Sequence, residues 1–228
     1  MRGYPPSDIP AQRSACHLPH LANDVAAIVA ATGHARTHVV GHDWGGIIAW
    51  TFAAMHPDRL DKLVIMNAPH MQIYIKKVWR TSQMFRSLYV GLFQLPALPE
   101  WLLAATDYRV VRTMFKRMPL QKDAFSDADI ACYVGMLALP GALKTALNYY
   151  RENLRSDGIT LASAARTDAE TLVIWGMQDP ALGAFLLDGL DRFAPRVRVH
   201  RIAHASHWVQ NEAPNEVNRV LVNFIDAA

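Results

Sequence analysis

The sequence has few cysteines, no long apolar run and no strong excess of charge. Only two of its 228 residues are cysteine, Cys16 and Cys132. Two cysteines make no disulfide framework, so a reducing, cytoplasmic compartment is expected. No stretch approaches the ~18–20 consecutive apolar residues of a membrane span, and the first residues lack the apolar core of a secretory signal. We therefore expect no membrane partner.

The charge pattern and the spacing of the histidines argue against two further classes of protein, those that bind nucleic acid and those that bind metal ions. The formal net charge is only +3, and the densest basic pairs are Lys76-Lys77 and Lys116-Arg117. No basic stripe or recognisable module accompanies them, so no nucleic acid is expected as a partner. Ten histidines are present, but neither HExxH nor paired CxxC spacing occurs, and no metal site is expected. The hydrophobic content of 51% predicts a chain that folds around a core.

Strand and helix patterns alternate along both ends of the chain. Short apolar runs predict strands, and amphipathic or apolar periodicity predicts helices between them; the strands are 37–40, 63–66, 171–175 and 197–202, and the helices 20–32, 47–55 and 215–225. This alternation favours an α/β fold with a parallel sheet. Residues 71–165 carry aromatic, Met and Pro residues at helical spacing. We therefore predict an α/β core from 1–70 and 166–228, with a helical cap inserted at 71–165.

A glycine-rich turn joins the first predicted strand to the next helix. It reads Gly41-His-Asp43-Trp-Gly45-Gly46. A tight strand-to-helix turn strains its central residue and requires small neighbours, which the three glycines provide. Asp43 is then expected at a helix N-terminus, where N–H groups stabilise negative charge. The alternative is a structural turn in which Asp43 only caps the helix.

This turn resembles the nucleophile elbow of the α/β-hydrolase fold, in the branch where aspartate replaces serine: epoxide hydrolases and haloalkane dehalogenases. The run Trp175-Gly-Met-Gln-Asp179 resembles the segment that bears the acid of this family, and residues 204–214 resemble the segment that bears its histidine. The match to the run Ser-His-Trp-Val-Gln favours His207 over His204. The order nucleophile, acid, histidine is the one that this fold uses. The resemblance implies a triad of Asp43, Asp179 and His207.

Each implied catalytic residue has a chemical reason. A carboxylate at Asp43 can attack a strained or activated carbon directly and form an ester. Hydrolysis of that ester needs a general base, His207, and Asp179 would hold its imidazole and stabilise the imidazolium. The backbone N–H of Trp44 would stabilise the oxyanion. This chemistry requires no metal or organic cofactor.

Two tyrosines of the predicted cap decide between the reactions of this branch. Tyr89 and Tyr150 resemble the pair with which epoxide hydrolases donate to the opened ring oxygen, and a phenol donates while neutral. Core packing of these tyrosines is the alternative. A dehalogenase instead needs N–H donors such as Trp44. Epoxide opening to vicinal diols therefore ranks first. Haloalkane dehalogenation or another α/β-hydrolase activity ranks second, ahead of a non-catalytic ligand-binding scaffold or inactive fragment. Met and aromatic residues in the cap favour a small apolar substrate.

The resemblance begins late in the pattern of the family. The run Met1 to Asp8 looks like the segment after the fourth strand, and no His-Gly-x-Pro oxyanion loop occurs. An internal start codon or a natural short form is expected, with a sheet that lacks its early strands. The strand at 37–42 would then be an exposed edge that favours a homo-oligomer. Loss of one oxyanion donor is expected to slow ester hydrolysis about 10²–10³-fold.

Overall fold

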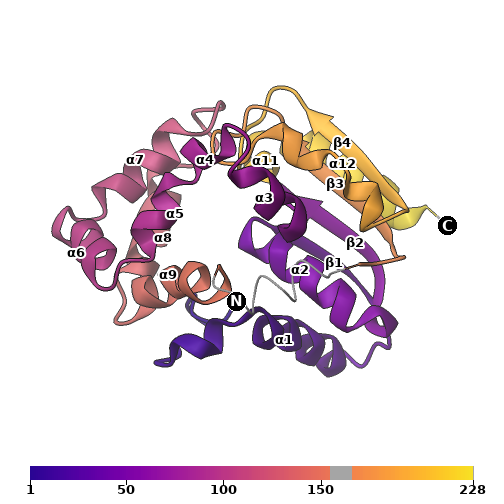
Figure 1. The fold of residues 1–228 in the computed structure, drawn as a ribbon, viewed down its shortest axis with the longest axis horizontal. Helices are drawn as coiled ribbons and strands as arrows, with labels where there is room; N and C mark the ends of the chain where they lie inside the picture. The colour runs from indigo at the N-terminus through magenta and orange to yellow at the C-terminus, as the bar shows by residue number, and fades with distance from the viewer. Residues whose placement is uncertain (155–165, 228) are drawn as a thin grey trace.

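Figure 1 shows the fold in a computed structural model, which describes residues 1–154 and 166–227. Four parallel strands form one sheet in the order β1-β2-β3-β4. They are β1 (Thr37–His42), β2 (Leu60–Met66), β3 (Glu170–Gly176) and β4 (Val197–Ile202). The predicted α/β class and parallel sheet are confirmed, and each predicted strand is present.

Side chains alternate between the two faces of the sheet, as the period of two in a strand requires. One face packs against α1 (Leu18–Ala31) and α2 (Trp44–Met55), and the other against α11 (Val209–Glu212) and α12 (Pro214–Asp226). The first face presents Leu63, Ile65, Val173 and Trp175; the second presents Val64, Met66, Leu172 and Ile174. Both central strands are therefore buried on two sides, which explains their continuous apolar runs.

The strand β1 forms one edge of the sheet in the described part of the chain. It pairs with β2 alone, with Val40 opposite Val64 and Gly41 opposite Ile65. Val40 is 43% exposed, whereas Val64 is fully buried. The sequence-based expectation of an uncovered edge at 37–42 therefore agrees with the burial of these strands.

The helices next to the sheet begin and end where their sequences require. α1 is followed by Gly33, whose φ of +76° is costly for residues with a Cβ. α2 is buried along most of its length and stops before Pro57, which lacks the N–H that a further helical turn would need. Short 3-10 helices cover Arg13–Cys16, Pro57–Arg59, Ala184–Leu187 and Leu190–Arg192.

Between β2 and β3, the described residues 71–154 form helices and turns without a strand, and in Figure 1 they arch beyond one end of the sheet. The helices are α3 (Met71–Val78), α4 (Gln83–Arg86), α5 (Leu88–Phe93), α6 (Leu98–Ala105), α7 (Arg109–Arg117), α8 (Asp127–Leu137) and α9 (Ala142–Asn153). Residues 155–165 of the predicted cap lie outside the described residues, and the domain division stays a prediction.

The helical residues have an apolar cluster of their own, formed by Val111, Phe125, Ile130 and Val134. Among the described residues, no single helix is long and apolar enough to cross a membrane. The pair α8 and α9 passes that test together by length and composition, but the two helices meet at an angle of 80°.

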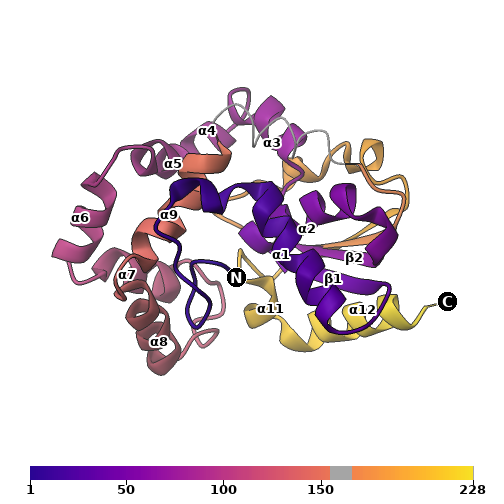
Figure 2. The same ribbon diagram turned by 90° about the horizontal axis from the view of Figure 1, so that it is seen from below.

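The first residues of the chain run beside α9 and α1 (Figure 2). The Tyr149 hydroxyl donates to the carbonyl of Arg2 at 2.6 Å, and the Arg2 guanidinium pairs with Asp24 of α1 at 2.5 Å. The Asn153 amide accepts from the N–H of Leu18 at 2.8 Å. The N-terminal segment therefore links the helical residues to the core helix α1.

Candidate active site

The turn between β1 and α2 strains Asp43, whose φ is +51° and ψ −123°. A Cβ at Gly41 would lie 2.3 Å from the carbonyl oxygen of Gly45, and one at Gly46 would lie 2.4 Å from the Cβ of Ala68. At Gly45 the nearest atom would be the Met1 sulfur at 3.8 Å, which is an ordinary contact. Gly41 and Gly46 therefore have no room for a Cβ, as expected, whereas a Cβ would fit at Gly45.

Three titratable side chains from three separate loops meet at the C-terminal ends of the strands. Asp43 follows β1, Asp179 follows β3 and His207 follows β4. The His207 Nδ1 lies 2.8 Å from Asp179 Oδ2, and its Nε2 lies 3.5 Å from Asp43 Oδ1. The side chains are 39% exposed for Asp43, 11% for His207 and 0% for Asp179. The outermost carboxylate is thus open to a small molecule, while the innermost one is closed to water.

Asp179 is held by three donors besides the histidine. The N–H groups of Ala181 and Leu182 donate to its Oδ1 at 2.7 and 2.9 Å, and the Asn67 side chain donates to Oδ2 at 2.7 Å. The Asn67 amide oxygen also accepts from the N–H of Gly176 at 2.9 Å. Sequence reasoning missed this role, although Asn67 directly follows β2 at the edge of the sheet where the triad lies.

The two carboxylates control the charge of the histidine. Burial disfavours the imidazolium of His207, but the charges and hydrogen bonds of Asp179 and Asp43 outweigh burial and raise its pKa to about 10. Burial alone would raise the pKa of Asp43. Hydrogen bonding and charge from His207 reverse this, with help from the Trp44 N–H, so the pKa of Asp43 is lowered. Asp43 is therefore an ionised carboxylate at neutral pH.

A second histidine, His42, contacts the backbone of His207. The Nε2 of His42 lies 2.8 Å from the carbonyl oxygen of His207, and the two rings are 4.9 Å apart. Because a carbonyl only accepts, Nε2 of His42 must carry the hydrogen. Burial, followed by the charge of His207, lowers the pKa of His42 and keeps it neutral. His42 thus fixes the backbone of the loop that bears His207.

The two tyrosines lie together beside the elbow. The rings of Tyr89 and Tyr150 are 6.1 Å apart, and the Tyr150 ring is 5.0 Å from the Trp44 ring. Burial raises the pKa of both phenols, and the charge of Asp43 adds to the rise. Both hydroxyls are therefore neutral donors at neutral pH. The neighbouring Tyr149 points to Arg2 instead, as its hydrogen bond shows.

Tyr4 is a third phenol close to Asp43 that sequence reasoning did not single out. Burial raises its pKa and the Asp43 charge adds to this, and its ring lies 5.6 Å from that of Tyr149. Its position in the run Arg-Gly-Tyr was the available signal. Through Tyr4, the N-terminal segment lies close to the turn that bears Asp43.

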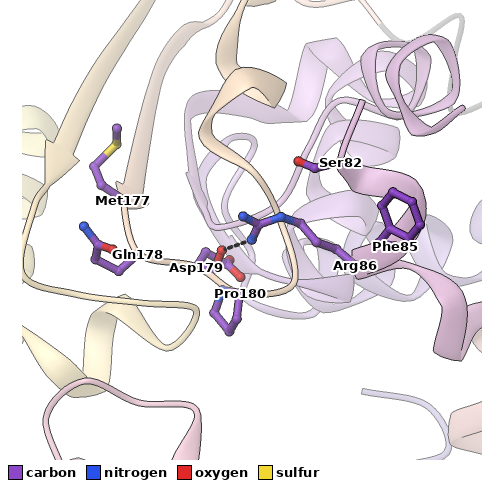
Figure 3. Close-up of a pocket in the computed structure, with 7 residues that line it drawn as sticks. All are labelled: Ser82, Phe85, Arg86, Met177, Gln178, Asp179 and Pro180. Atoms are coloured by element: carbon purple, nitrogen blue, oxygen red, sulfur yellow. Dashed lines mark hydrogen bonds between the residues drawn. The ribbon is translucent and has the colours of Figure 1, made fainter. Parts of the chain in front are cut away.

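A cavity of about 490 Å³ lies beside the Asp179 loop (Figure 3). Its lining combines polar and apolar side chains from α4 and from the loop after β3: Ser82, Phe85, Arg86, Met177, Gln178, Asp179 and Pro180. Arg86 donates to the carbonyl of Asp179 at 2.6 Å, so it ties α4 to the loop that holds the acid. Among the described residues, no group of three or more His, Cys, Asp or Glu side chains is placed to hold a metal ion.

The chain is similar to known proteins over nearly its whole length. A family model described as the α/β-hydrolase fold matches residues 1–214. An AB hydrolase superfamily protein from Bacillus subtilis is 32% identical over 98% of this chain and 78% of the relative. Epoxide hydrolase 3 from Xenopus tropicalis is 34% identical over 99% of this chain and 62% of the relative. The chain thus spans about three fifths of that relative.

A solved structure gives the same likeness in three dimensions. The crystal structure of a mutant of an epoxide hydrolase from Bacillus megaterium matches with a TM-score of 0.87 at 27% identity, covering 99% of this chain and 82% of that chain. A complex of the Bacillus megaterium enzyme with an inhibitor matches with a TM-score of 0.84 at 28% identity, over the same shares. The arrangement of sheet and helices therefore has a close counterpart among solved epoxide hydrolases.

Proposed function

We propose that this chain, which belongs to the α/β-hydrolase fold family, opens epoxides to vicinal diols through a covalent ester on Asp43. The observation that carries the proposal is the partly exposed Asp43 carboxylate 3.5 Å from the His207 imidazole, which Asp179 holds from its other side. The similarity to proteins named epoxide hydrolases supports the choice of substrate class.

In the first step, the ionised Asp43 carboxylate attacks an epoxide carbon. The carbon–oxygen bond of the ring breaks, an ester forms, and the ring oxygen takes a proton from Tyr89 or Tyr150. No base is needed, because the nucleophile is already an anion: its pKa is lowered by His207 despite burial. The neutral phenols are the nearby donors for the new hydroxyl.

In the second step, formation of the ester changes the histidine. Esterification removes the charge of Asp43, one of the two carboxylates that raise the pKa of His207. The pKa of His207 therefore falls, and the imidazolium gives its proton to the phenolate, which restores the phenol and leaves His207 neutral. Neutral His207 then takes a proton from water, and hydroxide attacks the ester carbon while the N–H of Trp44 faces the oxyanion. The departing alkoxide takes the proton that the hydroxide brought, which restores Asp43 and the imidazolium.

The tyrosine pair favours epoxides over haloalkanes. A dehalogenase needs free N–H donors for the departing halide, and the Trp44 ring packs edge-on against the Tyr150 ring, with centroids 5.0 Å apart. A halide at the Trp44 side chain would therefore have to share its surroundings with the phenol of Tyr150. The aromatic surroundings of Tyr150, with Phe93 at 5.1 Å, favour a small apolar epoxide.

The test of the reaction class is product formation from an aryl epoxide and from a haloalkane of similar size, with the Asp43→Asn variant as control. We expect diol from the epoxide, little halide from the haloalkane, and neither product from the variant. Halide release without diol would replace epoxide opening with dehalogenation. Diol formation that Asp43→Asn leaves unchanged would overturn the assigned nucleophile.

We also propose that the β1 edge pairs with a second copy of the chain. Its support is the 43% exposure of Val40 on a strand with one paired side among the described residues. Light scattering of the purified chain tests this: a dimer or larger assembly is expected, and a monomer at micromolar concentration would contradict it. The cytoplasmic compartment stays a prediction, supported by two free cysteines.

A further inference from the structure

Glu212, the last residue of α11, is a buried carboxylate that neutral donors surround. It is 7% exposed. Its Oε1 accepts from the N–H and hydroxyl of Ser206 at 3.0 and 2.6 Å, and its Oε2 accepts from the N–H of Leu120 at 2.7 Å. In the described part of the chain, no basic side chain lies in ion-pair range of Glu212. Such a buried acid costs free energy unless its hydrogen bonds are complete.

The donors to Glu212 come from two distant parts of the sequence. Ser206 precedes His207 in the loop after β4, whereas Leu120 lies in the turn after α7. The same two segments meet elsewhere: the Gln121 side chain donates to the carbonyl of His204 at 3.4 Å. Glu212 therefore connects the histidine loop to the helical residues. We call this set of contacts, formed by Glu212 with Ser206 and Leu120, the Glu212 joint.

The residue after the histidine is tied to the same helices. The ring of Trp208 lies 5.1 Å from that of Phe115 and 5.5 Å from that of Phe125. The Ser206 hydroxyl also lies 3.4 Å from the carbonyl oxygen of Met118, so both neighbours of His207 in the chain contact the helical residues. The position of the imidazole depends on this joint as well as on Asp179.

We propose that Glu212 is a positioning residue that holds the Ser206–His207 backbone so that the imidazole faces the ester on Asp43. The inference rests on the proposed function. Glu212 fixes the loop from the side of the helices, and His42 fixes it from the side of the sheet through the His207 carbonyl. With the backbone held from both sides, a water that enters beside Nε2 would have a defined direction of attack.

This role predicts an effect on one chemical step and not on the other. Attack by Asp43 on the epoxide requires no base, so it tolerates a displaced imidazole. Hydrolysis of the ester requires His207 to hold a water in line with the ester carbon, and a displacement of about 1 Å can cost 10²-fold. A loss of overall folding would instead lower both steps in proportion.

The experiment is a single turnover of the full chain with an aryl epoxide, in which intact-protein mass follows the rise and decay of the adduct. Glu212→Gln keeps the shape but places an NH₂ group against N–H donors. We expect its adduct to decay about 10–100-fold more slowly, with adduct formation changed less than about threefold. Glu170→Gln, at the far end of β3, is the matched control and is expected to leave both rates unchanged.

A second variant tests the same joint with a smaller change. Ser206→Ala removes the hydroxyl that donates to Glu212 and is expected to slow adduct decay in the same direction by less. Because both substitutions act on the bond between the Ser206 hydroxyl and the Glu212 carboxylate, the effects of the double variant are expected to be less than additive. This variant also serves as the test if Glu212→Gln does not fold.

Three results would overturn the positioning role: equal slowing of both steps, an unchanged decay rate in both variants, or slowing in Glu170→Gln as well. These outcomes differ from failure of the proposed function. In that case the unmodified chain itself gives neither adduct nor diol, and the positioning role falls with it. An adduct in the unmodified chain with normal decay in the variants rejects the role of Glu212 alone.

Discussion

The imidazole Nε2 of His207 lies 3.5 Å from the Oδ1 of Asp43, so the nucleophile helps to hold a proton on the base. The pKa of His207 reaches about 10 because two carboxylates flank it, in spite of its burial. In the resting site His207 is therefore an imidazolium, which cannot act as a base. Formation of the ester removes one carboxylate charge and releases the base for the step that needs it.

The first prediction follows from this pair. Asp43→Asn removes the negative charge beside His207 but keeps an amide oxygen there, so the pKa of the imidazole is expected to fall clearly below about 10. An NMR titration of the histidine side chains measures this shift. Glu170→Gln, at the far end of β3, is the control and is expected to leave the pKa of His207 unchanged. An unchanged His207 pKa would show that Asp43 does not stabilise the imidazolium.

The second prediction concerns stability against pH. A histidine whose folded-state pKa is raised to about 10 from an unfolded value of about 6.5 stabilises the fold fully below pH ~6.5 and loses that contribution as pH rises towards 10. Urea unfolding at pH 6 and pH 9.5 is therefore expected to show a larger drop for the unmodified chain than for His207→Gln. Equal drops would contradict the pKa shift.

The third prediction separates two adjacent tyrosines. Tyr150→Phe removes a donor near Asp43 and is expected to slow adduct formation from an epoxide about 10-fold or more, and further when combined with Tyr89→Phe. Tyr149→Phe removes the bond to the Arg2 carbonyl instead, and is expected to lower the free energy of unfolding by about 1 kcal/mol with little effect on the adduct. The reverse pattern would reassign the donor.

The fourth prediction uses two adjacent glycines of the elbow. Gly46→Ala places a Cβ 2.4 Å from that of Ala68 and is expected to destabilise the fold by about 1–3 kcal/mol. Gly45→Ala meets only the Met1 sulfur at 3.8 Å and gains helix propensity in α2, so its effect is expected to be neutral or stabilising by up to about 1 kcal/mol. Denaturant unfolding of both variants measures the difference. Similar losses for both would contradict the geometry of the turn.

The fifth prediction concerns the support of the acid. Asn67→Ala leaves the buried N–H of Gly176 without its acceptor and removes one of the two groups that contact Asp179 Oδ2, so that only His207 Nδ1 remains there. The expected cost is about 1–3 kcal/mol of unfolding free energy, together with slower decay of the adduct. Asn67→Asp keeps the size but places a second carboxylate against Asp179. It is expected to be at least as harmful, and a harmless Asn67→Asp would rule out the hydrogen bond to Asp179.

Apolar runs predicted the strands, and the resemblance to the elbow, acid and histidine segments of the α/β-hydrolase fold implied the residues that meet at their ends. Asp43, Asp179 and His207 each follow a strand with an apolar run, and parallel strands bring their carboxyl ends to one edge. The supporting residues carried no such signal. Glu212 bonds to Leu120, 92 positions earlier in the chain, and His42 bonds to a carbonyl 165 positions later. Such pairs depend on the packing of distant loops, which periodicity along the sequence does not encode.

The most direct test of the ester on Asp43 is a single turnover of an aryl epoxide in H₂¹⁸O, with mass analysis of the diol and of the peptide that contains Asp43. If Asp43 is the nucleophile, the first diol carries its new oxygen from the carboxylate and no label, and the peptide gains ¹⁸O as water attacks the ester. A labelled first diol with an unlabelled peptide would mean that water attacks the epoxide directly, and would contradict the covalent mechanism.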